Sequence, residues 1–190
     1  WSQTQRLEAS DQQANDNFGY SVDIDSSGEY AIIGAYLEDE NGSQAGAAYI
    51  FKDSSGTFVE KQKLTASDGL ANDNFGYHVS ISDSSATVVV GANNKDYMTY
   101  LPSASPGQPK YTTLSNAGAA YVFKQTNDVW SEFSKIQASD AETNDNFGIS
   151  VSISGDASKV LVGAQSEDTG ADNNGKAYSF NVNSQNTEPY

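Results

Sequence analysis

The sequence predicts an all-β protein made of three copies of one four-stranded unit. The first observation is a segment that begins Asn-Asp-Asn-Phe-Gly and occurs at Asn15, Asn72 and Asn144. The second is an apolar run after each copy that ends in Gly-Ala, at Gly34, Gly91 and Gly163. No stretch has a sustained 3.6-residue period, so we expect almost no helix. Repeats of this kind bury their apolar faces against one another, which predicts one array.

The spacing of the copies locates one insertion. Phe18 and Phe75 are 57 residues apart, whereas Phe75 and Phe147 are 72 apart. The additional 15 residues fall in the second copy, at about Met98 to Thr112. We therefore divide the single array 1–190 into an additional strand, a first unit, a second unit with an insertion, and a third unit, at residues 1–9, 10–66, 67–138 (insertion 98–112) and 139–190.

Each unit is expected to contain the same elements in the same order. Trp1 to Ala9 is predicted to be a strand, because Trp1 and Leu7 have the six-residue spacing found again in Phe58 with Leu64 and in Trp130 with Ile136. A loop rich in Asn and Asp follows, and these residues favour loops because their side chains bond nearby backbone N–H groups.

The remaining strands differ in their apolar pattern. The Phe-Gly strand alternates, which indicates one buried face. The strand that ends in Gly-Ala is apolar throughout, which indicates cover on both faces. The third strand begins Gly-Ala-Ala-Tyr at Gly46 and at Gly118, and its small residues let neighbouring sheets approach closely. Four strands per unit with short turns are typical of a β-propeller blade.

Phe-Gly, Val-Gly-Ala and Gly-Ala-Ala-Tyr-Val-Phe closely resemble the FG-GAP repeat, the blade of integrin α-subunit propellers. The resemblance covers nearly the whole chain. It implies that the Phe-Gly strand is innermost and the Trp/Leu strand outermost, so the third unit ends at Phe180 with no outermost strand after it. We expect the N-terminal strand of the same or another chain to complete the third blade, because it is the additional copy of the outermost strand. Three blades are fewer than close a propeller ring, which argues against closure of the chain on itself. A fragment of a longer protein is the alternative.

Composition limits the function classes. The chain has 10 Lys and Arg against 25 Asp and Glu, a formal net charge of −15, which argues against nucleic acid as a partner. It has no Cys and one His, so nucleophilic catalysis has little to work with and we expect no enzyme activity. The sequence contains no run of 18 apolar residues, so we expect no membrane insertion. We expect an extracellular or cell-surface location.

Calcium is the cofactor considered. The calcium-binding loop found in integrin blades, which the resemblance implies, is matched only in part, at Asp23-Ile24-Asp25. A second candidate is a set of loop carboxylates and amides that recurs in register in every unit, as a structural ion per blade would require. Its alternative is a set of side chains that cap their own loop. The set is Asp11, Asn15, Asp16, Asp68, Asn72, Asp73, Asp140, Asn144 and Asp145. A third acidic group is interpreted as solvated surface: Glu38, Asp39, Glu40, Glu167, Asp168 and Asp172.

The insertion is unusually aromatic for a loop. It is a candidate contact surface for a neighbouring subunit or ligand, or else a flap over its own blade. Its residues are Tyr97, Tyr100, Leu101 and Tyr111. Asn41 begins the one Asn-x-Ser/Thr sequon and is a candidate for glycosylation. We expect Trp1 and Trp130 to lie in the core.

We predict a non-enzymatic extracellular protein, structural or adhesive, that associates with copies of itself through Trp1, Leu7 and Phe180 as a filament or closed oligomer. An unpaired strand edge demands such a partner. The alternative is a lectin-like or protein-binding propeller module that recognises a glycan or a surface protein.

Overall fold

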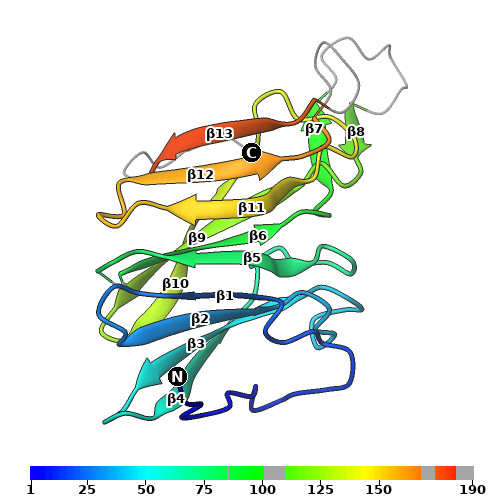
Figure 1. Cartoon of the computed structure of the whole chain (residues 1–190). Helices are drawn as coiled ribbons and strands as arrows, with labels where there is room; N and C mark the ends of the chain where they lie inside the picture. The colour runs from blue at the N-terminus through cyan, green and yellow to red at the C-terminus, as the bar shows by residue number, and fades with distance from the viewer. Residues whose placement is uncertain (85, 101–109, 168–173, 183–190) are drawn as a thin grey trace.

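A computed structural model describes residues 1–84, 86–100, 110–167 and 174–182. Three antiparallel sheets, here called blades 1 to 3, lie one above another (Figure 1). Blade 1 contains β1 (Ser21–Ile24), β2 (Tyr30–Ala35), β3 (Ala47–Asp53) and β4 (Phe58–Leu64). Blade 2 contains β5 (Phe75–Ile81), β6 (Thr87–Ala92), β9 (Ala119–Thr126) and β10 (Val129–Ile136). Blade 3 contains β11 (Phe147–Ile153), β12 (Lys159–Ala164) and β13 (Lys176–Asn181).

The strand order within the blades confirms the prediction. Blade 1 has the order β1-β2-β3-β4, blade 2 the equivalent order β5-β6-β9-β10, and blade 3 the order β11-β12-β13. The Phe-Gly strand is therefore at one edge and the Phe58 or Trp130 strand at the other. The described residues form strands, turns and loops, and none of them forms a helix that is long and apolar enough to cross a membrane.

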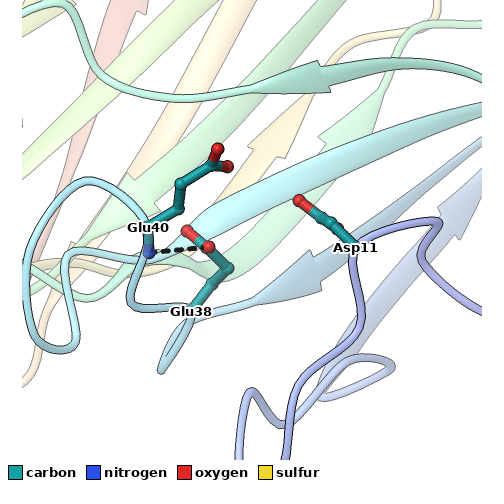
Figure 2. A group of neighbouring side chains, drawn as sticks. All are labelled: Asp11, Glu38 and Glu40. Carbon is teal, nitrogen blue, oxygen red and sulfur yellow. Dashed lines mark hydrogen bonds between the residues drawn. The ribbon is translucent and has the colours of Figure 1, made fainter.

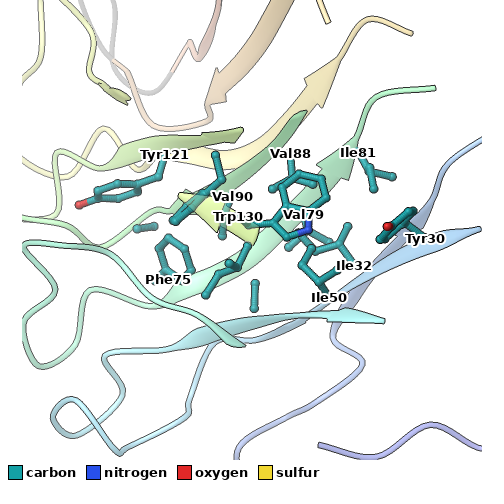
Figure 3. Packing of buried hydrophobic residues seen from close by; sticks show 14 of the residues in the cluster. Tyr30, Ile32, Ile50, Phe75, Val79, Ile81, Val88, Val90, Tyr121 and Trp130 are labelled. Carbon is teal, nitrogen blue, oxygen red and sulfur yellow. The ribbon is translucent and has the colours of Figure 1, made fainter. Parts of the chain in front are cut away.

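The blades are held together by apolar cores at their junctions. Between blades 1 and 2, Ile32 and Ile50 of blade 1 pack with Phe75, Val79 and Val90 of blade 2, and Figure 3 shows these side chains interdigitating. A second core joins blade 2 to blade 3. Trp130 lies in the first core and is 3% exposed, as expected. Each unit thus buries its apolar face against the next unit, which is why the array needs neighbouring copies.

Glycines let the backbones of adjacent blades touch. A Cβ atom on Gly34 would lie 2.0 Å from the carbonyl oxygen of Gly76 in the next blade, and a Cβ on Gly91 would lie 1.9 Å from that of Gly148. Gly46 forms a parallel bridge with Phe75 across the same junction. The Phe-Gly and Gly-Ala motifs are therefore the contact points between blades, since a side chain at either Gly34 or Gly91 would clash with backbone.

The prediction that every second strand is covered on both faces holds for two blades. All six residues of β2 and of β6 are buried, but in β12 Lys159 and Leu161 are exposed. The prediction is wrong for β12 because, among the described residues, no blade packs on that side of blade 3.

Two predictions for the N-terminus are wrong for the chain by itself. Residues 1–9 run along blade 1 beside β4 (Figure 1) but form no strand, because no strand pairs with them in the described structure. Trp1 is fully exposed rather than in the core. Leu7 and Ala9 do pack on the core of blade 1.

The insertion contains a hairpin of β7 (Tyr97–Tyr100) and β8 (Tyr111–Leu114), which extends from one edge of the array (Figure 1). The rings of Tyr100 and Tyr111 pack edge to face with centroids 5.5 Å apart, and both side chains are more than half exposed. Leu101, also predicted to belong to the contact surface, lies outside the described residues. The role of this hairpin in binding stays a prediction.

Candidate functional site

The repeated Asn-Asp loops bind their own backbone. Asp16, Asp73 and Asp145 are buried, and each carboxylate accepts a hydrogen bond from the N–H group three residues earlier, at distances of 2.7, 2.7 and 2.6 Å. Asn15, Asn72 and Asn144 adopt left-handed conformations with φ of 77°, 71° and 70°. These loops are therefore ordered by the capping interactions that the sequence offered as the alternative to a metal.

The other Asp of each loop points toward a tyrosine and a lysine. Asp11 accepts hydrogen bonds from the Tyr49 hydroxyl at 2.8 Å and from Lys63 Nζ at 2.6 Å. Asp68 accepts them from the Tyr121 hydroxyl at 2.6 Å and from Lys135 Nζ at 2.8 Å. Each tyrosine belongs to a Gly-Ala-Ala-Tyr strand, and each lysine to the outermost strand of the same blade. The site thus joins three parts of one blade.

In blade 1 this site is a cluster of three carboxylates that could hold a metal ion. Oxygen atoms of Asp11, Glu38 and Glu40 all lie within 4.8 Å of one another, and Figure 2 shows the three side chains facing a common point. Lys63 Nζ lies there, at 2.6, 3.0 and 2.5 Å from Asp11, Glu38 and Glu40. Glu38 is 2% exposed and Glu40 is exposed. The ammonium of Lys63 therefore supplies one positive charge at the point that the three carboxylates face.

Charge pairing outweighs burial in setting the pKa values of Asp11 and Lys63. Burial favours the neutral Asp11 carboxyl, but the hydrogen bonds from Lys63 and Tyr49 prevail, so the pKa of Asp11 is lowered from 3.8. Burial likewise disfavours the charged Lys63, yet its bonds to Asp11, Glu40 and Glu38 raise its pKa above 10.5. Both groups are charged at neutral pH as a result.

Blade 2 has the same arrangement with a different distribution of charge. Lys95 occupies the position of Glu38, is buried, and donates to Asp73 at 2.8 Å and to the Asp68 carbonyl at 2.6 Å. Burial raises the pKa of Asp68, but hydrogen bonds from Lys135 and Tyr121 outweigh this effect and the pKa is lowered. Two lysines therefore balance the two Asp side chains of this blade.

Among the described residues, blade 3 has no outermost strand and so no lysine from one. Lys176, at the start of β13, takes over the pairing, with Nζ 3.1 Å from Asp140 and 2.8 Å from Glu167. Burial raises the pKa of Asp140, but hydrogen bonds from Lys176 and Tyr178 outweigh this effect, so the pKa is lowered from its usual value. The side chains of Lys176 and Asp140 remain 36% and 40% exposed, so the site is open to solvent.

The interpretation of Glu38 and Glu167 as solvated surface is wrong. Both are buried, at 2% and 1% exposure, because the turn after β2 or β12 brings them under a lysine. Asp39 and Glu40 are exposed as predicted, and Asp168 and Asp172 lie outside the described residues. Sequence reasoning also missed Lys63, Lys95 and Lys135. Aligning the three units indicates a charge pair at this position, because Lys95 occupies the place of Glu38 and Glu167.

The remaining predicted sites are separate from this cluster. Asp25 accepts a hydrogen bond from Tyr30 N–H and Asp23 one from Ile81 N–H of the next blade, so the trace of an integrin-type calcium loop is used for internal bonding. Asn41 is exposed in a turn, which is compatible with a glycan. Phe180 packs at a right angle on Phe147, with ring centroids 5.9 Å apart.

Comparison with known protein families identifies the repeat. A family model described as the FG-GAP repeat matches the chain three times, at residues 1–51, 58–123 and 130–180. Each match begins at an outermost-strand segment and ends in the Gly-Ala-Ala-Tyr strand or its equivalent. A search of curated proteins finds no match.

Proposed function

The chain belongs to the FG-GAP repeat family, and from this premise we propose that it is a non-enzymatic structural or adhesive protein that associates with itself outside the cell or at the cell surface. Its blades carry apolar junctions and clusters in which lysines pair with carboxylates, and the proposed function uses the one blade that the described residues leave incomplete.

The observation that carries the proposal is the edge of β13. In blades 1 and 2 the equivalent strands β3 and β9 pair on both sides, with β4 and β10 at the outer edge. Among the described residues, no strand pairs with the outer edge of β13. A row of unpaired N–H and C=O groups is a template for a strand from another chain.

Residues 1–9 are suited to fill that edge. Gln5 exchanges two hydrogen bonds with the backbone of Phe58, both 2.8 Å long, as Gln62 of β4 does with the backbone of Trp130. Ser10 binds Glu60 of β4 in the way that Ser67 binds Glu132 of β10. The segment therefore lies on blade 1 where the outermost strand of a preceding blade would lie.

The native mass of the purified chain tests this function. We expect a mass of at least two chains by light scattering, and a variant without residues 1–9 should have the mass of one chain. A mass of two chains indicates a closed ring of six blades, within the range that propellers use. Larger particles indicate a head-to-tail filament. A folded single chain at all concentrations would contradict the proposal.

We also propose that calcium is not needed at the cluster of Asp11, Glu38 and Glu40, because Lys63 Nζ already lies among the three carboxylates and pairs with each of them. Replacing Lys63 with Met keeps the aliphatic stem but leaves three carboxylates facing one another. The melting temperature of Lys63→Met should fall by a few degrees, and millimolar Ca²⁺ should restore part of the loss, since clustered carboxylates bind this ion.

Lys135→Met is the matched control. It removes the equivalent lysine in blade 2, where Lys95 remains beside Asp68 and Asp73, so Ca²⁺ should not restore its stability. The native chain should have the same melting temperature with calcium or with a chelator. A native melting temperature that rises with calcium would show that the ion binds while Lys63 is in place.

A further inference from the structure

We propose that the partner is a second copy of this chain docked head to tail, so that blade 1 of one copy packs on blade 3 of the other and its residues 1–9 become the fourth strand of that blade. The inference rests on the proposed self-association and adds the two faces, the strand register and the residues that join them. The new junction repeats the two junctions inside the chain.

The two faces that would meet are left bare at opposite ends of the array. In blades 2 and 3 the preceding blade buries the inner-strand residues Val79 and Val151, which are 2% and 4% exposed, but the equivalent Val22 of blade 1 is 66% exposed. At the other end, Leu161 is 53% exposed although its equivalent in blade 1, Ile32, is buried by the following blade. Each exposed face is thus the counterpart of one that is covered elsewhere.

No backbone conformation or backbone contact within blade 3 requires glycine at position 163. The equivalent glycines, Gly34 and Gly91, admit the carbonyl oxygens of Gly76 and Gly148 from the next blade. A Cβ on Gly163 would meet only its own blade, nearest the rotatable hydroxyl of Ser150, and its φ is not left-handed. Gly19, the equivalent of Gly76, has nothing within 4 Å of a built Cβ. The φ of Gly19, 89°, already favours glycine there, whereas close approach of Gly19 of a second copy would explain the glycine at position 163.

In the described part of blade 3, the charge cluster has no cation from an outermost strand, and residues 1–9 carry one. Lys63 and Lys135 lie five residues after Phe58 and Trp130, and Arg6 lies five residues after Trp1. Within the chain, Arg6 contacts Glu8 at 2.7 Å and its side chain is 76% exposed. Placed on β13 as its equivalents lie on β3 and β9, it reaches the Asp140 site, where the carboxylate is still 40% exposed.

The repeats also fix the register of the new pair. Tyr49 pairs with Lys63 and Tyr121 with Lys135, so Tyr178 should pair with Arg6. Further along, Lys52 pairs with Val59 and Lys124 with Ser131, which places Asn181 opposite Ser2 of the second copy.

A disulfide tests the register, because the chain has no native Cys. A variant carrying Ser2→Cys and Asn181→Cys should form intermolecular disulfides under mild oxidation, since opposite residues of antiparallel strands meet the distance that a disulfide requires. The control, Ser2→Cys with Ser179→Cys, is shifted by two residues, roughly 7 Å along the strand, and should cross-link far less. A disulfide within one chain would show closure without a second copy and would overturn the inference.

Substitutions test the faces. Gly163→Ala should keep the circular dichroism spectrum and melting temperature of the separated chain but weaken self-association about tenfold or more, because the methyl group blocks close approach. Arg6→Glu should weaken it severalfold, whereas Arg6→Lys, which copies Lys63 and Lys135, should not.

Failure of this inference differs from failure of the proposed function. If the native chain assembles, yet the in-register cysteines stay reduced and Gly163→Ala assembles as the native chain does, then self-association stands and the head-to-tail junction is wrong. If the native chain is a single folded copy at all concentrations, both are wrong.

Discussion

Gly91→Ala is expected to destabilise the chain by about 3 kcal/mol or more, which is a large share of the roughly 5–15 kcal/mol that stabilises a folded domain. The added Cβ would lie 1.9 Å from the carbonyl oxygen of Gly148 and 3.0 Å from its carbon, which is a clash with backbone rather than with a movable side chain. Blades 2 and 3 would have to separate to admit it. Urea unfolding followed by circular dichroism measures the loss.

Gly163→Ala is the control for this prediction. It changes the same position of the repeat, but in the blade that no described neighbour covers, so the separated chain should unfold within about 1 kcal/mol of the native one. Equal losses at Gly91 and Gly163 would show that alanine is rejected by the blade itself and not by the junction.

Phe75→Ala is expected to cost about 3–5 kcal/mol, the usual range for deleting a buried phenylalanine ring. Phe75 is 1% exposed and packs edge to face on Tyr121 and Phe123 of its own blade, with centroids 5.5 and 5.9 Å apart. It also belongs to the core shared with Ile32 and Ile50 of blade 1. Its loss therefore weakens a blade and a junction together.

Phe18→Ala separates these two contributions. Phe18 packs on Tyr49 and Phe51 with centroids 5.5 and 6.0 Å apart, nearly as Phe75 packs on its own pair. It is only partly buried, because no blade among the described residues packs on that side of blade 1. We expect its substitution to cost clearly less than that of Phe75 in the separated chain. A similar cost at both positions would mean that the junction contributes little. In an assembled sample the two costs should converge.

The fold was largely predictable because the sequence states it three times. Strands placed in one unit were checked by the other two, and the order of strands within a blade followed from the family that the motifs resemble. The site was predictable only in part. The Asp residues of the loops were found, but their partners were not, since Lys63 lies 52 residues from Asp11 and no local pattern links them.

The sequence by itself determined the number of units, the strands of each blade and the positions of the glycines, because these depend on local patterns that recur. The tertiary structure decided which copies of one residue are buried. Val22 and Val79 have the same place in the repeat but differ in exposure, at 66% and 2%, because a blade covers the second and not the first. It also decided that an ammonium group lies among the carboxylates of blade 1, since burial and charge pairing depend on the neighbours that folding brings together.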